Sequence, residues 1–291
     1  MPQKKHLGRR LLRLSFWLVV VVVAVFGVQV GLLAFPQVLL PNKAEAGSVV
    51  IYYDGDPDPL VQEWVQATDH RLRAGGFGDP DFPERIFFFR HQGLYAFFTR
   101  LARQPAEAQG FGISALGTTY VSGPRVEDLG ERTGRAPRYS VWEGSIPHTM
   151  AHEIAHLYMV DSIGRSIWAS LPQWKREGFP EYVANIGLIR SDATASLPRR
   201  IDILLDDGQW LGPRSWDRIH YEAGLLTEFL LDVRGYDLQA VIPDSITHAD
   251  THAAMLGWYR QEMGSNGHEE PGPSIREPHV PEGASTSEDI Q

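Results

Sequence analysis

The sequence predicts an α+β protein in which an apolar N-terminal helix precedes one larger domain, residues 47–264. Two observations lead to this fold class. Segments rich in β-branched and aromatic residues lie between residues 48 and 142, and from Ser145 onward the pattern becomes mostly helical. With strands first and helices later, the helices are expected to gather beside the sheet instead of alternating with its strands.

The first 35 residues predict a membrane anchor. Residues 1–13 form a basic segment without any acid, and its cations are Lys4, Lys5, Arg9, Arg10 and Arg13. Residues 14–35 carry no charge, and as a helix they would extend about 33 Å, enough to cross the core of a lipid bilayer. Because the cations precede this span, we expect a cytoplasmic N-terminus and a domain on the other side of the cell membrane.

A cleaved signal peptide is the alternative interpretation of the same segment. The small residues of Ala44–Ala46 would serve as its cleavage site. The apolar stretch is longer than the core of a usual signal peptide, roughly 7–15 residues, which favours a retained single-pass anchor. Under either interpretation, the domain is exported across the cell membrane.

In the first half of the chain, apolar runs separated by turn signals predict the helices and strands. Residues 59–76 and 94–103 predict amphipathic helices, the first ending at a pair of glycines. The glycines and β-branched residues of 110–123 predict a strand pair or an edge strand. The remaining predicted strands are residues 48–54, 85–90 and 138–142.

Composition excludes several classes of function. The chain has a formal net charge of −9 and no long basic run in its globular part, so nothing supports a nucleic-acid partner. It has no cysteine, which excludes disulfides and thiolate ligands. Residues 265–291 are rich in acids and prolines and have little to bury, so we expect a disordered acidic tail.

The segment HTMAHEIAHLYMV, residues 148–160, predicts a metal site on a helix. Ser145 and Pro147 are typical of a helix start, and the helix should end near Asp161. Residues four apart share one helical face, so His152 and His156 can hold one metal ion while Glu153 acts as the general base.

His148 and His152 have the same spacing and form an alternative pair of ligands. The residue after His148 is Thr149, which cannot take a proton from water near neutral pH. The register that begins at His152 supplies a base, so His148 is expected to be solvated or to support a ligand.

A catalytic zinc ion needs three protein ligands and one open position. Without cysteine, the third ligand should be His, Asp or Glu. The segment WKREGFPEYVA, residues 174–184, supplies Glu177 and Glu181 on one helical face, far enough along the chain for a second helix to pack across the first.

The combination of His152-Glu153-Ile154-Ala155-His156 with Glu177-Gly178-Phe179 resembles the gluzincin zinc metallopeptidases, which include thermolysin-like and M1 aminopeptidase-like enzymes. This resemblance implies a metallopeptidase-like domain that binds one Zn²⁺ per chain through His152, His156 and Glu177, with Glu153 as base. It also implies that Glu181 hydrogen-bonds a zinc-binding histidine and so orients its ring.

Two features depart from that family. Pro180 follows Glu177 by three residues, so the helix either begins near Glu177 or kinks at the proline. The Gly-x-Met-Glu-Asn segment by which M1 aminopeptidases bind a free amino terminus is absent, which favours an endopeptidase.

Peptide hydrolysis places negative charge on the carbonyl oxygen, and a hydrogen-bond donor should stabilise it. Tyr221, which begins an amphipathic helix, resembles a tyrosine that related peptidases use in this role. An ordinary core tyrosine is the alternative for Tyr221. His220 and Tyr120 are weaker candidates, and the edge strand around Tyr120 is a possible binding site for an extended peptide.

The sequence therefore predicts a membrane-anchored zinc-dependent peptidase, of endopeptidase type, that acts on peptide or protein substrates. A non-catalytic exported zinc module that serves binding or assembly is the alternative from a different class. A zinc amidase that acts on a non-peptide substrate is a third interpretation. The Glu153 side chain separates the module from the enzymes, because a purely structural zinc site needs no base.

Overall fold

A computed structural model of the chain describes residues 3–77, 84–105, 107–125, 145–189, 196–206, 215–242 and 245–266. The elements of the first half are α1 (Gln3–Ala34), η1 (Pro36–Leu39), β1 (Asn42–Ala46), β2 (Val49–Tyr53), α2 (Pro59–Ala74), β3 (Glu84–Phe89), α3 (Gln92–Ala102), β4 (Gly110–Ile113), η2 (Ser114–Leu116) and β5 (Thr118–Ser122). Those of the second half are α5 (Ile146–Ile163), α6 (Arg165–Ser170), α7 (Gln173–Ile189), α8 (Leu197–Leu205), α9 (Ser215–Glu228), η4 (Phe229–Val233), α10 (Leu238–Val241) and α11 (His248–Asn266). The α+β prediction is confirmed.

The strands form one mixed sheet of five, in the order β1-β2-β3-β5-β4. The inner pairs β2–β3 and β3–β5 are parallel, and the outer pairs β1–β2 and β4–β5 are antiparallel. The strands predicted from residues 48–54, 85–90 and 110–123 are all present, the last as a pair whose β4 is an edge of the sheet. Strand β1 precedes the predicted start of the domain at residue 47. The strand predicted at 138–142 lies outside the described residues.

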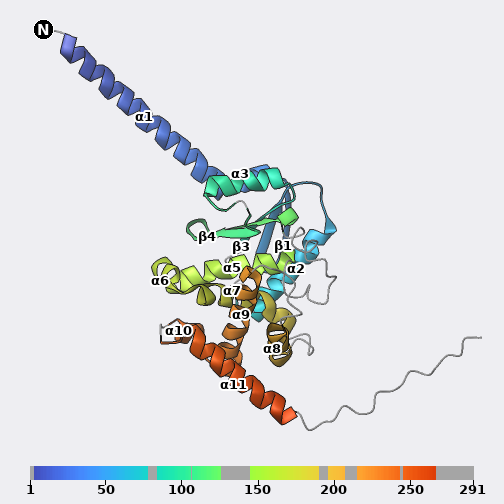
Figure 1. Ribbon diagram of the computed structural model, residues 1–291. Helices are drawn as coiled ribbons and strands as arrows, with labels where there is room; N and C mark the ends of the chain where they lie inside the picture. The colour runs from blue at the N-terminus through green and yellow to red at the C-terminus, as the bar shows by residue number, and fades with distance from the viewer. Residues whose placement is uncertain are drawn as a thin grey trace, which may run out of the picture.

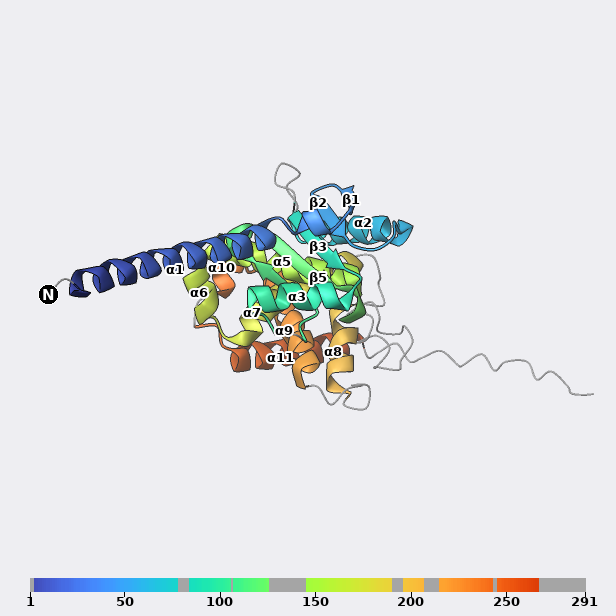
Figure 2. The same cartoon turned by 90° about the horizontal axis from the view of Figure 1, so that it is seen from above.

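Each face of the sheet is covered by helices, and alternation along the strands decides which side chains meet them (Figures 1 and 2). Ile86 and Phe88 of β3 join a core shared with α2, α5 and α7. Phe87 and Phe89 point to the opposite face and join an aromatic cluster with Tyr95 and Phe98 of α3. The sheet therefore separates two cores.

The helical half is built outward from α5. Helix α7 packs on α5, and α9 packs on α7 (Figure 1). Gly178 permits the second contact, because a Cβ there would lie 2.5 Å from the Ala223 carbonyl oxygen. Helix α7 begins at Gln173, so a helix start near Glu177 is wrong, and Pro180 lies inside the helix.

Helix α1 contains a segment, Arg13–Ala34, that is long and apolar enough to cross a membrane. A signal sequence near the N-terminus would satisfy the same criterion. At the other end of the chain, α11 extends to Asn266, and residues 267–291 of the predicted tail lie outside the described residues.

Candidate metal centre

Helix α5 starts and runs as the sequence predicts. The Ser145 hydroxyl caps it by accepting a hydrogen bond from the His148 backbone N–H at 3.2 Å. Because the three histidines are four residues apart, their rings lie in a row along one face, with centroid separations of 6.1 Å between His148 and His152 and 4.9 Å between His152 and His156. The whole row faces α7.

Glu177 on α7 meets the two later histidines. Its Oε2 lies 3.5 Å from His152 Nε2 and 3.2 Å from His156 Nε2, and the two Nε2 atoms are 3.2 Å apart. A tetrahedral ion with ligand bonds of about 2.0–2.1 Å requires ligand atoms about 3.3 Å apart. The three donor atoms therefore have about the spacing of ligands in a tetrahedral metal site.

His220 on α9 reaches the same place from another direction. Its ring stacks on that of His152 with centroids 5.7 Å apart, and its Nε2 lies 3.9 Å from Glu177 Oε2. His152, Glu177 and His220 form a group whose ligand atoms all lie within 4.8 Å of one another and which can hold a metal ion. Two overlapping triads thus share His152 and Glu177. The set completed by His156 is closer to the spacing of a tetrahedral site.

The charges of the group are strongly coupled. Burial alone would lower the pKa of His152, but its hydrogen bonds with Glu177 and Glu181 outweigh burial and raise the pKa to about 10. The same contacts hold the pKa of Glu177 far below its usual range, although burial opposes them. For His220, burial and the neighbouring His152 lower the pKa. A carboxylate and nitrogen donors that converge in this way are suited to a cation.

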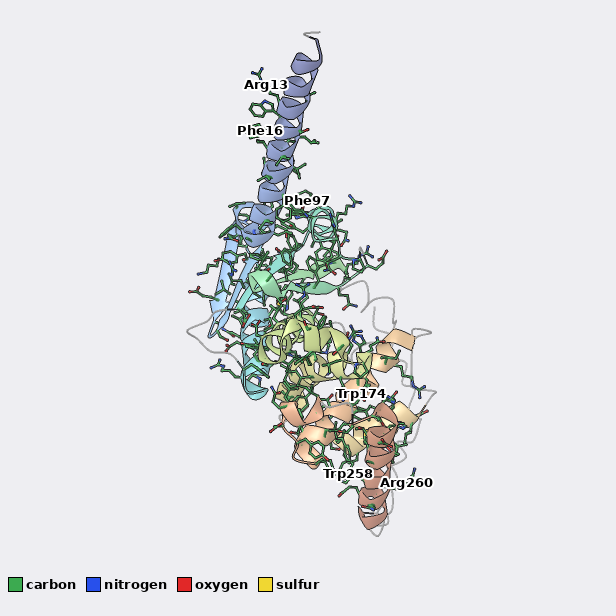
Figure 3. The ribbon with its side chains drawn as sticks, turned by 90° about the vertical axis from the view of Figure 1, so that its left-hand side faces the viewer. Arg13, Phe16, Phe97, Trp174, Trp258 and Arg260 are labelled. Carbon is green, nitrogen blue, oxygen red and sulfur yellow. The ribbon has the colours of Figure 1, made fainter. Side chains whose placement is uncertain are left out.

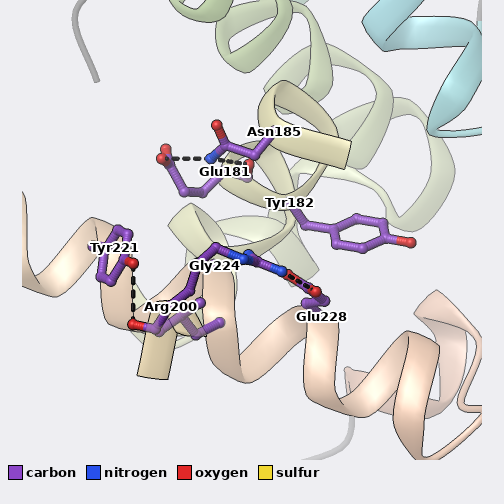
Figure 4. A pocket seen from close by; sticks show the side chains of 8 residues that line it. Glu181, Tyr182, Asn185, Arg200, Tyr221, Gly224 and Glu228 are labelled. Atoms are coloured by element: carbon purple, nitrogen blue, oxygen red, sulfur yellow. Dashed lines mark hydrogen bonds and ion pairs between the residues drawn. The ribbon is translucent and has the colours of Figure 1, made fainter. Parts of the chain in front are cut away.

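Glu181 stands behind His152, one helical turn after Glu177. Its Oε2 lies 3.2 Å from His152 Nδ1 and its Oε1 lies 3.1 Å from His148 Nε2. The Asn185 side-chain amide donates to Glu181 Oε1 at 3.0 Å (Figure 4). The two histidines keep the pKa of this buried carboxyl well below its usual range, against the effect of burial. An ionised Glu181 fixes the orientation of the His152 ring.

Glu153 of α5 packs against β4. A Cβ on Gly110 would lie 2.8 Å from Glu153 Cγ. Strand β4 can therefore cover the Glu153 side chain only because Gly110 has no Cβ. Gly112 lies against Leu157 in the same way. Burial raises the pKa of Glu153, while His156 and His152 lower it less. A carboxyl with a raised pKa beside a metal group is a suitable proton acceptor and donor.

Two tyrosines that the sequence suggested as hydrogen-bond donors face other partners. The Tyr221 hydroxyl donates to the Arg200 carbonyl oxygen at 3.1 Å, and its ring belongs to the core between α8, α9 and α11 (Figure 4). The Tyr120 hydroxyl donates to the Leu33 carbonyl oxygen, on the other face of the sheet. His220, the neighbour of Tyr221, is the residue of α9 that approaches Glu177.

Sequence reasoning missed a second group of histidines. His248 and His252 of α11 both approach Glu222 of α9, with Nε2–Oε1 distances of 3.1 and 3.7 Å. The signal was present in the sequence HADTH, residues 248–252, which repeats the spacing of four. His248 and His252 are much more exposed than the histidines of α5.

Comparison with known proteins adds no assignment. No family model matches the chain, and no curated protein matches it. The metal group therefore stands on its own geometry, and the resemblance to gluzincins rests on the segments around His152 and Glu177.

Proposed function

We propose that the protein is a membrane-anchored zinc peptidase whose domain faces away from the cytoplasm. One observation carries the proposal: His152, His156 and Glu177 present three donor atoms 3.2–3.5 Å apart. Glu153 directly follows His152 in the chain and is not one of the three proposed ligands. A site that only braces the fold has no need of such a carboxylate.

His152, His156 and Glu177 hold the ion in this proposal. Bound zinc acts as a Lewis acid toward a carbonyl oxygen and lowers the pKa of water. Glu153 accepts the proton of the attacking water and passes it to the leaving amine. Its raised pKa supports both steps, because a carboxyl that is too acidic would hold a proton too weakly to deliver it.

His220 is the better candidate for the donor that stabilises the carbonyl oxygen. Its ring stacks on His152 beside the proposed ion, whereas the hydroxyl of Tyr221 is directed to the backbone of Arg200. An imidazole N–H can supply the hydrogen bond that the developing negative charge requires. This choice replaces Tyr221 in the role that the sequence favoured.

The substrate is a peptide in extended conformation. Strand β4 is the edge of the sheet nearest to Glu153, and an edge strand can pair with an incoming peptide backbone. Gly110 and Gly112 place this edge directly on α5. A peptide paired with β4 would then pass beside Glu153, which favours cleavage within a chain.

Contacts of α1 support its retention as an anchor. The Gln29 amide donates to the Leu101 carbonyl oxygen at 2.7 Å, and Leu33 is buried in the aromatic cluster under α3. Ala44–Ala46, the alternative cleavage site, belongs to β1 and pairs with β2. Removal of residues 1–46 would take away a strand and part of a core. The intact mass of protein purified from membranes should therefore include α1, and a mass lacking residues 1–46 would establish a signal peptide.

The central experiment is Glu153→Gln in the full-length protein. We expect the variant to retain one zinc ion per chain and to lose hydrolysis of an unfolded protein substrate by about 10²–10⁴-fold. Zinc is measured by elemental analysis after dialysis against metal-free buffer. A matched control is Glu63→Gln, which removes an exposed carboxylate on α2 and should change neither quantity.

Other outcomes point to other functions. Substantial hydrolysis by Glu153→Gln would show that another group is the base. Wild-type protein that binds one zinc ion but cleaves no peptide would favour the non-catalytic module or an amidase for a non-peptide substrate. Folded protein without zinc, and unable to take it up, would end the enzyme proposal.

A further inference from the structure

The lipid-facing part of α1 is shorter than the apolar run suggests. Every residue from Leu14 to Val28 is exposed, and Gln29 is the first whose side chain is engaged by the domain. These residues extend about 22 Å along the helix, whereas the hydrocarbon core of a bilayer is about 30 Å thick. The exposed part of the anchor is therefore several ångströms shorter than the hydrocarbon core is thick, and this difference is the deficit.

Apolar side chains also surround the end of α1 that meets the domain. Phe35, Val38 and Leu39 follow the helix directly and are 56%, 73% and 44% exposed. Phe97 projects from α3 beside the base of α1 and is 42% exposed (Figure 3). We call these four residues the collar. Water-exposed side chains of this size, gathered at one place, indicate an interaction surface.

The anchor and the domain are tied together at this point. Gln29 of α1 bonds to the last turn of α3, and Tyr120 of β5 bonds to the Leu33 carbonyl oxygen. Leu33 and Leu40, on either side of η1, are both buried in the aromatic cluster. Since α1 is fixed to the domain, its depth in the bilayer also sets the depth of the collar.

We propose that the collar is immersed in the leaflet on the domain's side, so that the domain sits on the bilayer through η1 and the outer face of α3. The proposal commits to a phospholipid bilayer because the collar continues the exposed apolar surface of α1. Apolar side chains at such surfaces enter the boundary of headgroups and acyl chains by about 5–10 Å, which matches the deficit. The exposed cations Arg100 and Arg103 lie close by in the chain, where they can meet phosphate groups.

This seating fixes the direction from which substrate arrives. Helix α3 lies on one face of the sheet, and α5 and α7, which carry the metal group, lie on the other (Figure 1). The site is then directed away from the lipid, so its substrates are segments in the aqueous phase and not membrane-spanning ones. The seating rests on the retained anchor of the proposed function but not on zinc or hydrolysis.

The test uses the absence of cysteine in the chain, which makes every introduced thiol unique. Full-length Phe97→Cys and Val38→Cys proteins are labelled with an environment-sensitive nitrobenzoxadiazole dye. They are reconstituted in vesicles of phosphatidylcholine and phosphatidylglycerol at a ratio of about 3:1, so that the bilayer carries negative surface charge. Leu205→Cys on α8 is the matched control, because Leu205 is 49% exposed but lies in the helical half of the domain. Val20→Cys within α1 reports on the anchor itself.

We expect dyes at positions 97 and 38 to emit at shorter wavelength than the dye at 205, and to be several-fold less accessible to iodide. They should also be quenched by brominated acyl chains, as the dye at position 20 is. If position 20 is protected while 97 and 38 are as accessible as 205, the anchor stands and the seating is wrong. If position 20 is accessible as well, the anchor fails and the seating with it. Neither result bears on zinc binding, which is read separately.

Discussion

The molecule holds two groups of the same composition, each with two histidines four residues apart on a helix and one glutamate from a neighbouring helix. In the buried group, His152, His156 and Glu177, the side chains are 10–16% exposed. In the surface group, His248, His252 and Glu222, they are 21–46% exposed. Spacing alone does not distinguish the two groups.

The two groups differ in the arrangement of their rings and in the hydrogen bonds that hold those rings. The rings of His152 and His156 lie edge to face with centroids 4.9 Å apart, whereas those of His248 and His252 are stacked nearly parallel with centroids 6.0 Å apart. Glu181 hydrogen-bonds His152 from behind, and Asn185 in turn donates to Glu181. A second layer of hydrogen bonds thus preorganises the rings of the buried pair, as such support does for metal ligands in general.

Removal of a proposed ligand should weaken zinc binding more than any other single change. His152→Ala and His156→Ala should each weaken zinc binding by at least about a thousandfold, because the free energy of zinc binding is shared among few ligands. His248→Ala/His252→Ala, which removes the same two side chains from the surface group, should leave a tightly bound zinc ion in place. Competition with a chelator of known affinity measures both.

The opposite distribution of the tight ion would contradict this expectation. If the surface double variant lost the tight ion while His152→Ala kept it, preorganisation by Glu181 would have no bearing on where zinc binds.

The second layer should have a smaller effect. Glu181→Gln keeps the size of the side chain but removes the charge that His152 and His148 face, and we expect zinc affinity to fall by about 10–100-fold. Glu222→Gln is the matched change in the surface group and should leave the affinity of the tight site unaltered. Equal affinities of the wild type and Glu181→Gln would mean that the ring of His152 is positioned by packing alone.

The buried group comes together because α7 and α9 pack closely, and Gly178 permits this close packing. A Cβ at Gly178 would lie 2.3 Å from Thr227 Oγ1 on α9, so Gly178→Ala should destabilise the fold by about 1–3 kcal/mol. A Cβ at Gly257 on α11 would meet nothing within 4 Å, and Gly257→Ala should stabilise the protein by about 0.5–1 kcal/mol. Urea unfolding measures both, and a Gly178→Ala variant as stable as the wild type would show that α7 and α9 can separate at no cost.

Sequence patterns predicted most of the local structure. The cap at Ser145 and the row of three histidines on one face follow from helical periodicity and short-range chemistry, so α5 and the placing of its histidines were predictable. Strand β1 was missed, because its alternating, half-exposed residues give a weak apolar signal.

The arrangement of distant elements was not predictable in the same way. Which residue of α9 faces the metal group depends on the rotation of α9 against α7, and this is set by Gly178 and its neighbours. His220 and Tyr221 are adjacent in the chain but point to different partners, Glu177 and Arg200. The resemblance of Tyr221 to a tyrosine of related peptidases could not show which of the two residues faces the metal group.

Zinc binding and proton release should be linked through the coupled charges of the buried group. A zinc ligand must be a neutral imidazole, but the pKa of His152 without metal is raised to about 10. Zinc binding at pH 8 should therefore release about one proton, and affinity should rise up to tenfold per pH unit between about pH 7 and 10.

The stability of the metal-free protein should change in the opposite direction over part of this range. A raised pKa means that His152 contributes stability fully below its ordinary pKa near 6.5, and this contribution is lost as the pH rises through about 10. Calorimetric zinc titrations in two buffers of different ionisation enthalpy count the released protons. The surface double variant should release the same number, since the proton comes from the buried group. Zero release at pH 8 would mean that His152 is already neutral and that Glu177 and Glu181 do not raise its pKa.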